Sequence, residues 1–104
     1  MQSSKTDVIV LAVARARPGK EAELESALRE VAGPTRTQPG CVQFALYRPA
    51  GDRATIVGYE RWASEEAHQQ HLKGPHVQRL MARMADCLAG PPSIVTPLKP
   101  TAPS

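Results

Sequence analysis

The sequence predicts an α+β fold in the order β-α-β-β-α-β, with helices covering one face of a four-stranded antiparallel sheet. Three observations predict it. Residues 7–14 are apolar at nearly every position, residues 41–62 alternate as a hairpin does, and stretches with helical spacing separate the strands. The length of 104 residues fits one domain, to which we assign residues 7–98. Residues 1–6 are expected to form a disordered N-terminal tail and residues 99–104 a Pro-rich C-terminal tail.

The first strand, DVIVLAVA at residues 7–14, is rich in β-branched residues and apolar on both of its faces. A strand of this kind is typical of a sheet that is buried on both sides. Helices within the chain cover only one side, so a second subunit is the natural cover for the other. We therefore predict a homodimer in which two sheets meet face to face, with Val57, Tyr59 and Arg61 at or near the interface.

The first helix is predicted over residues 20–32, because its apolar residues recur at helical spacing. Gly33 and Pro34 are expected to end or kink this helix, since proline lacks the N–H that continues a helical ladder. The residues that form the apolar stripe are Leu24, Ala27, Leu28, Val31 and Ala32.

The hairpin joins residues 41–48 to residues 54–62, and its first strand places Val42, Phe44 and Leu46 on one face. Ser64 is a good N-cap for a helix that ends at residue 71 or 72. The chain restarts at residues 74–75 into a second helical stripe, and residues 93–98 form the last strand. The second stripe consists of Val77, Leu80, Met81, Met84 and Leu88.

Charge and cysteine content exclude several classes of protein. Lys and Arg number 13 against 10 Asp and Glu, but the cations are scattered, so we expect no nucleic-acid partner. Cys41 and Cys87 lie far apart without metal-ligand spacing and are interpreted as small core residues of a reducing compartment. The apolar run at residues 8–14 is too short to span a bilayer, so we expect no membrane association and a cytoplasmic location.

Longer stretches of the chain carry a resemblance to a known family. After the apolar first strand come RPGKEAELESAL, TRTQPGCVQFALYR and YERWASEEAHQQHLKGPHVQRL. This pattern, over residues 7–98, resembles the antibiotic biosynthesis monooxygenase (ABM) domain family. The resemblance implies a ferredoxin-like fold and a dimeric α/β barrel. Characterised members of the family include cofactor-independent quinol or polyketide oxygenases, autoinducer-processing enzymes and haem-degrading enzymes, so the substrate has to be argued from the site.

The candidate site lies in YERWASEEAHQQHL, residues 59–72. Strand parity puts Glu60 and Trp62 on one face, which the resemblance implies is the face covered by helices. His71 on the following helix then approaches them, and a carboxylate beside an imidazole fixes its tautomer and raises its basicity. We predict His71 and Glu60 as a catalytic pair. The predicted substrate-binding residues are Trp62 as an aromatic wall, Gly58 as the space above the sheet, and Ile56 and His76.

Simpler interpretations stay open for the same residues. Glu60 and His71 also fit a buried hydrogen-bonded pair that ties helix to sheet, with Trp62 as a core residue. His68 and His71 have a spacing that reaches a metal ion, but a third ligand is not evident, so no metal site is predicted. His68 is expected on the solvated side of its helix, and His76 either faces solvent or lines the lip of a pocket.

Haem degradation is disfavoured by the resemblance itself. The haem-degrading members use an asparagine in the first strand and an iron-ligating histidine in the last helix. The first strand here has no asparagine, and Leu80 and Met81 stand near the ligand position. No nucleotide or flavin motif is present either, so we expect no cofactor.

Two functions from different classes remain. The first is a cofactor-independent monooxygenase that oxidises a quinol-like or polyketide-type aromatic with dioxygen, the substrate supplying the electrons once His71 has removed a proton. The second is a non-catalytic dimeric module that binds a small ligand or serves a stress response, in which Glu60 and His71 have only a structural role.

Overall fold

A computed structural model describes residues 7–98 and 101 of the chain. Four strands form one antiparallel sheet in the order β2-β3-β1-β4. The order of elements along the chain is βαββααβ, so the predicted fold is confirmed, with the second helical region divided into two helices. The elements are β1 (Val8–Arg15), α1 (Glu21–Arg36), β2 (Cys41–Tyr47), β3 (Thr55–Trp62), α2 (Glu65–Leu72), α3 (Pro75–Ala85) and β4 (Ser93–Leu98).

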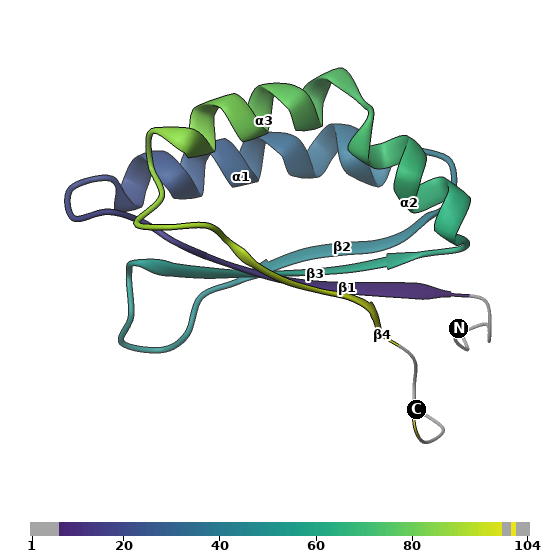
Figure 1. Ribbon diagram of the computed structural model, residues 1–104, viewed down its shortest axis with the longest axis horizontal. Helices are drawn as coiled ribbons and strands as arrows, with labels where there is room; N and C mark the ends of the chain where they lie inside the picture. Colours follow the sequence, from purple (N-terminus) through teal and green to yellow (C-terminus); the bar gives the residue numbers. More distant parts are fainter. Residues whose placement is uncertain (1–6, 99–100, 102–104) are drawn as a thin grey trace.

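All three helices lie on the same side of the sheet, and the opposite side carries none of them (Figure 1). β1 is an inner strand between β3 and β4, which suits its apolar sequence. Its pairing with β3 sets Val10 opposite Glu60 and Leu11 opposite Tyr59. Val10 and Glu60 therefore share the helix-covered face, while Leu11 and Tyr59 share the other face.

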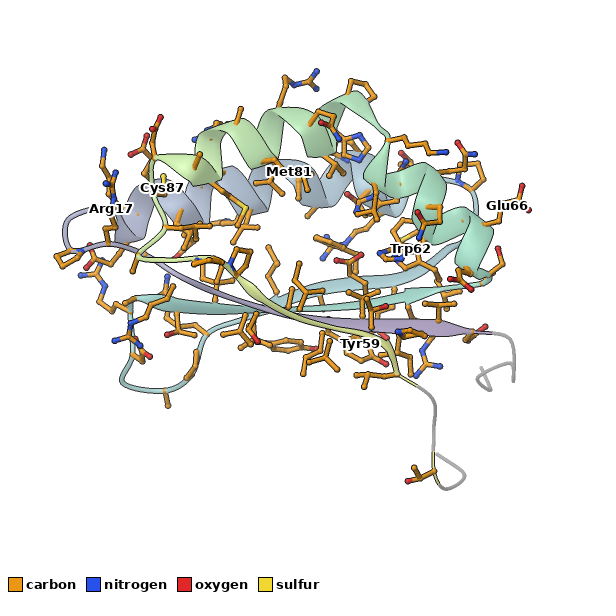
Figure 2. The ribbon with its side chains drawn as sticks, viewed as in Figure 1. Arg17, Tyr59, Trp62, Glu66, Met81 and Cys87 are labelled. Carbon is orange, nitrogen blue, oxygen red and sulfur yellow. The ribbon has the colours of Figure 1, made fainter. Side chains whose placement is uncertain are left out.

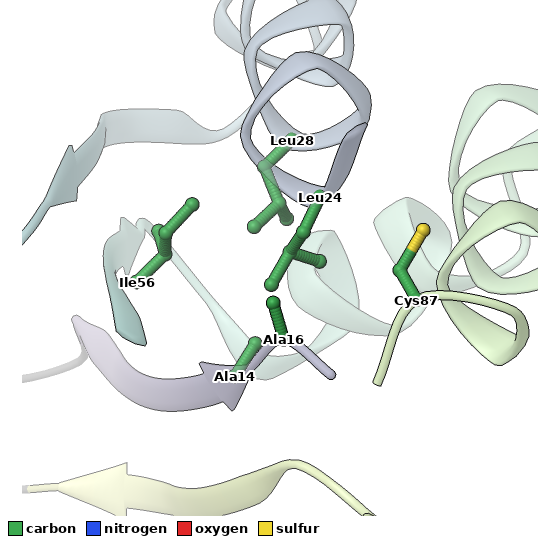
Figure 3. Close-up of a cluster of buried hydrophobic side chains, with 6 residues drawn as sticks. All are labelled: Ala14, Ala16, Leu24, Leu28, Ile56 and Cys87. Carbon is green, nitrogen blue, oxygen red and sulfur yellow. The ribbon is translucent and has the colours of Figure 1, made fainter. Parts of the chain in front are cut away.

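The main core lies between α1 and the sheet. Leu24 and Leu28 of α1 point down onto Ile56 of β3 and onto the end of β1, and Cys87 closes the side of the cluster (Figure 3). Leu24 and Cys87 are fully buried, as the sequence predicts for an amphipathic helix and a structural cysteine. A second cluster joins α1, β2 and α3 through Val31, Ala32, Phe44 and Val77.

The predicted end of the first helix at Gly33 and Pro34 is wrong, because α1 continues to Arg36 with Pro34 inside it. Proline costs one helical hydrogen bond, but tertiary contacts hold the last turn. Thr35 is fully buried, and the Arg36 guanidinium donates from Nε and Nη2 to the carbonyl oxygen of Phe44 at 3.1 and 2.9 Å. These contacts depend on how α1 packs against β2, so the local sequence at Gly33 and Pro34 does not indicate them.

Two predicted core positions are exposed. Val42 is 42% exposed, because a β-bulge between Cys41 and Gln43 makes it an extra residue and turns Cys41 onto the helix-covered face in its place. Met81 is 54% exposed. It lies about 100° round the helix from Leu80, which packs inward, so the buried stripe of α3 is narrower than predicted.

The helix starts follow the predicted signals. Ser64 caps α2, and its hydroxyl oxygen accepts a hydrogen bond from the backbone N–H of Ala67 at 3.1 Å. Pro75 opens α3 directly after Gly74.

No helix in residues 7–98 is both long and apolar enough to cross a membrane. The predicted tails at residues 1–6 and 99–104 lie, except for Thr101, outside the residues that the structure describes.

Candidate active site

Trp62, the last residue of β3, is the fixed centre of the predicted site. It lies between the sheet and the helices, whereas Tyr59 points from the opposite side of the sheet (Figure 2). The predicted strand parity is therefore confirmed. Trp62 is 0% exposed and packs with Val8 and Val10 of β1. At this position it is a buried core residue as well as a neighbour of the candidate groups.

Glu60 lies one same-face position before Trp62 on β3. The indole Nε1–H of Trp62 donates a hydrogen bond to Glu60 Oε1 at 2.9 Å. Burial raises the pKa of the Glu60 carboxyl, while the hydrogen bond from Trp62 acts in the opposite direction and favours the carboxylate. The carboxyl group is thus held in place by the residue that was expected to form the pocket wall.

His71 on α2 faces this pair. Its ring centroid lies 4.6 Å from that of Trp62, and its Nε2 lies 3.7 Å from Glu60 Oε1. That separation is longer than a hydrogen bond. Burial, followed by the nearby His76 and His68, lowers the pKa of His71 from 6.5 to about 4. The pKa of His71 is therefore lowered, whereas a neighbouring carboxylate is expected to raise it.

The direct partner of His71 is Gln38, a residue of the QPG turn. His71 Nδ1 lies 2.6 Å from Gln38 Oε1. An amide oxygen only accepts hydrogen bonds, so Nδ1 of a neutral His71 carries the hydrogen and Nε2 keeps its lone pair facing Glu60. Gln38, rather than Glu60, therefore makes the contact that fixes the tautomer of His71.

The loop that presents Gln38 runs unusually close to α2. Gly40 has φ +85°, and a Cβ added there would lie 2.5 Å from Cβ of Ala67. The glycine thus allows a backbone conformation and a close approach that a side chain would prevent. Sequence periodicity does not reveal this contact, although a glycine after a proline in QPG is a signal for a tight turn.

The other two histidines complete a cluster of rings. His68 is 6% exposed, so its predicted solvated position is wrong; its ring centroid lies 6.2 Å from that of Trp62. Burial lowers the pKa of His68, opposed by the charge of Glu65. The ring of His76 lies 5.7 Å from that of His71, and its Nε2 is buried without a hydrogen-bond partner in the described part of the chain.

A cavity of about 560 Å³ lies between α1 and the β2–β3 hairpin. Its lining includes Ile56 but not Gly58, Glu60, Trp62, His71 or His76. A Cβ added to Gly58 would make only an ordinary contact, 3.8 Å from Leu46 Cδ2. An alanine at residue 58 would therefore fit without a clash, so the space above the sheet does not depend on a glycine there. His76 lines a smaller hollow of about 150 Å³ between α1 and α3.

No group of three or more His, Cys, Asp and Glu side chains within residues 7–98 and 101 is placed to hold a metal ion. The two cysteines are both free thiols. Burial, and secondly the charge of Glu60, raises the pKa of Cys41, so this thiol next to the site favours its protonated form.

Comparison with known proteins agrees with the sequence resemblance. A family model described as "Antibiotic biosynthesis monooxygenase" matches residues 7–83. A Mycobacterium tuberculosis protein named "Putative monooxygenase Rv0793" is 33% identical over 87 residues, which make up 84% of this chain and 85% of that protein. The "Uncharacterized protein sll1783" of Synechocystis is 23% identical over 84% of this chain, which spans 59% of the length of that relative.

Solved structures show the same fold. The structure of Rv0793 from Mycobacterium tuberculosis superposes with a TM-score of 0.83 at 30% identity, covering 92% of this chain and 99% of that one. PA3566 from Pseudomonas aeruginosa superposes with a TM-score of 0.87 at 26% identity, covering 96% of this chain and 100% of that one. The ferredoxin-like arrangement of strands and helices is thus shared over nearly the whole length.

Proposed function

Because the chain belongs to the antibiotic biosynthesis monooxygenase family, we propose that it is a cofactor-independent monooxygenase that oxidises a quinol-like or polyketide-type aromatic with dioxygen. The observation that carries the proposal is the neutral His71, whose Nδ1 is engaged by Gln38 and whose Nε2 faces Glu60. A histidine in this tautomer has one unshared electron pair for a proton. Proton removal is the step that makes such an aromatic reactive toward dioxygen.

The chemistry requires little from the protein beyond a base and a dry site. His71 Nε2 accepts a proton from the phenolic hydroxyl or the acidic ring carbon of the substrate. The electron-rich anion then reduces dioxygen: a carbon–oxygen bond forms, the O–O bond breaks, and the second oxygen atom leaves as water with the two hydrogens that the substrate loses. The substrate therefore supplies every electron in the reaction.

Glu60 and Trp62 have supporting roles in this proposal. A carboxylate 3.7 Å from Nε2 stabilises the imidazolium that forms when His71 takes the proton, and the 2.9 Å bond from Trp62 holds that carboxylate. A pKa of about 4 keeps His71 free of protons at neutral pH.

The test is oxygen consumption with a panel of hydroquinones and anthrones, without added flavin, haem or metal. His71→Gln should lower turnover by about 100-fold or more, since general base catalysis contributes about that much. His68→Gln is the matched control, because it also removes a buried histidine from α2 while leaving the base in place. Loss of turnover to the same extent in both variants would count against His71 as the base.

A non-catalytic ligand-binding or stress-response module of the same fold is the second candidate. The complete burial of Trp62 favours it, since a side chain without exposed surface also suits a purely structural role. Glu60→Gln separates the two functions. The glutamine keeps an oxygen for the Trp62 bond and removes a buried charge, so a catalytic Glu60 loses turnover while stability stays equal or rises. A panel without turnover on any electron-rich aromatic would favour the module.

We also propose that two copies pair through the sheet face opposite the helices. Apolar residues of three strands lie on that face, including Leu11 of β1, Val57 of β3 and Val95 of β4. Arg61 on this face is already paired with Asp7, with Nη1 3.3 Å from Oδ2. A face of this kind suits a two-fold interface with an identical copy. The free thiols support a reducing, cytoplasmic setting for this dimer.

A further inference from the structure

The cavity of about 560 Å³ between α1 and the β2–β3 hairpin combines an apolar base with a charged rim. Its apolar lining comes from Ala32 of α1, Leu46 of β2 and Ile56 of β3. Its size falls within the range that small-molecule sites occupy. A flat hydrocarbon ring is the ligand chemistry that such a base accommodates.

The rim is strongly cationic. Three guanidinium groups, Arg29, Arg36 and Arg48, line the cavity together with a single carboxylate, that of Glu25. Glu25 forms an ion pair with Arg48 and a longer one with Arg29, at 3.5 Å. Arg36 has no carboxylate partner among the residues that the structure describes, and it is oriented by its two hydrogen bonds to Phe44 O. A neighbouring hollow of about 530 Å³ shares Glu25, Arg29 and Arg48 and adds Glu30 and Arg53.

The cavity also lies in line with the candidate active site. Ile56, Gly58 and Glu60 follow one another on the helix-covered face of β3. Leu46 of the cavity stands opposite Gly58 in the sheet, and Phe44, whose carbonyl holds Arg36, stands opposite Glu60. The four-residue step from Ile56 to Glu60 spans about 13 Å along a strand. The base of the cavity at Ile56 thus lies on the same face of β3 as Glu60, two same-face positions away.

We propose that this cavity binds a planar aromatic carboxylate, with Arg29, Arg36 and Arg48 selecting the negative charge and Glu25 moderating it. The inference rests on the proposed function, because it gives the aromatic substrate its class: an aromatic acid rather than a neutral ring. Arginine suits this role, since its fork of N–H groups matches the two oxygens of a carboxylate.

The test is equilibrium binding of 2-naphthoate and of its neutral analogue 2-naphthamide to the full chain, measured by calorimetry at constant ionic strength. The two probes share a ring system and differ in charge, so their ratio of dissociation constants measures the selection. We expect 2-naphthoate to bind at least about tenfold more tightly, the size of one charge-assisted hydrogen bond. Arg48→Gln should abolish most of this selectivity for 2-naphthoate. Glu25→Gln should increase the selectivity, because the substitution releases Arg29 and Arg48 from their carboxylate partner.

Lys73→Gln is the control, because it removes an exposed positive charge directly after α2 that does not line the cavity. Similar affinities for the two probes, no binding of either probe, or equal losses in Lys73→Gln and Arg48→Gln would overturn the proposal. Because neither probe is turned over, these results are separate from the oxygen-consumption test. An inactive protein that still selects the carboxylate would contradict the proposed function alone, and an active protein without this selection would contradict the cavity alone.

Discussion

The protonation of His71 provides the sharpest test of the site's geometry. Its pKa falls from 6.5 to about 4 on folding, because the ring is buried beside Trp62. Between these two pH values the unfolded chain binds a proton that the folded chain does not, so stability is fully present above pH 6.5 and decreases as the pH falls. A difference of about 2.5 pKa units corresponds to about 3 kcal/mol.

Glu60 works in the opposite direction over part of the same range. Burial raises the pKa of its carboxyl, so the folded chain holds that proton more tightly than the unfolded chain does. Falling pH therefore adds stability through Glu60 while it removes stability through His71. The wild-type protein is expected to show only the difference between the two effects. Glu60→Gln abolishes the opposing contribution and exposes the effect of His71.

The assay is urea unfolding between pH 7 and pH 4, followed by the fluorescence of Trp62, the single tryptophan of the chain. In the Glu60→Gln background, the free energy of unfolding should fall by up to about 3 kcal/mol over this range. Adding His71→Gln should abolish most of that fall, while carboxylates elsewhere contribute equally to both variants. Equal pH dependence in the single and the double variant would refute the assignment of a buried neutral His71.

Three further predictions concern the surroundings of the site. Gly40→Ala should cost about 1–2 kcal/mol or more in urea unfolding, because φ is +85° and the new Cβ would lie 2.5 Å from a carbon of α2; wild-type stability would contradict the close approach. Gln38→Leu should move the hydrogen of His71 away from Nδ1, read from nitrogen-15 chemical shifts, and should cost about 1–3 kcal/mol; an unchanged tautomer would show that another group fixes it. Val57→Lys places a charge in the proposed interface, so the mass in light scattering should fall from that of a dimer to about 11.2 kDa. Met81→Lys on the exposed side of α3 should leave the dimer mass unchanged. A wild-type protein of monomer mass would refute the interface.

Periodic patterns predicted the fold and the face that Trp62 and Glu60 share. Alternation along β3 needs only the two-residue repeat of a strand, so the parity of Glu60, Trp62 and Tyr59 follows from the sequence alone. The bulge that exposes Val42 interrupts this repeat without a composition signal. The burial of His68 likewise depends on how α2 is tilted over Trp62, which local spacing does not determine.

The partner of His71 was missed for a related reason. Gln38 and His71 are 33 positions apart, and their contact exists only because the QPG turn folds against α2. Hydrophobic periodicity carries no information on such a polar contact, whereas a glycine forced by positive φ at residue 40 indicates that something lies close to the turn. The tight turn was predicted, but what it approaches was not.

Burial favours the uncharged form of both candidate groups, His71 and Glu60. It lowers the pKa of His71 and raises that of Glu60, so each group is driven toward its uncharged form. The indole hydrogen bond from Trp62 acts against this shift for Glu60 and favours the carboxylate form. In the proposed mechanism, a proton delivered to His71 by the substrate would create an ion pair with Glu60 across 3.7 Å in a poorly solvated site, where the attraction between the charges is stronger than in water. In the proposed mechanism, Trp62 therefore supports the base by favouring the carboxylate form of Glu60, and a Trp62→Phe variant that kept the packing would lose this contribution.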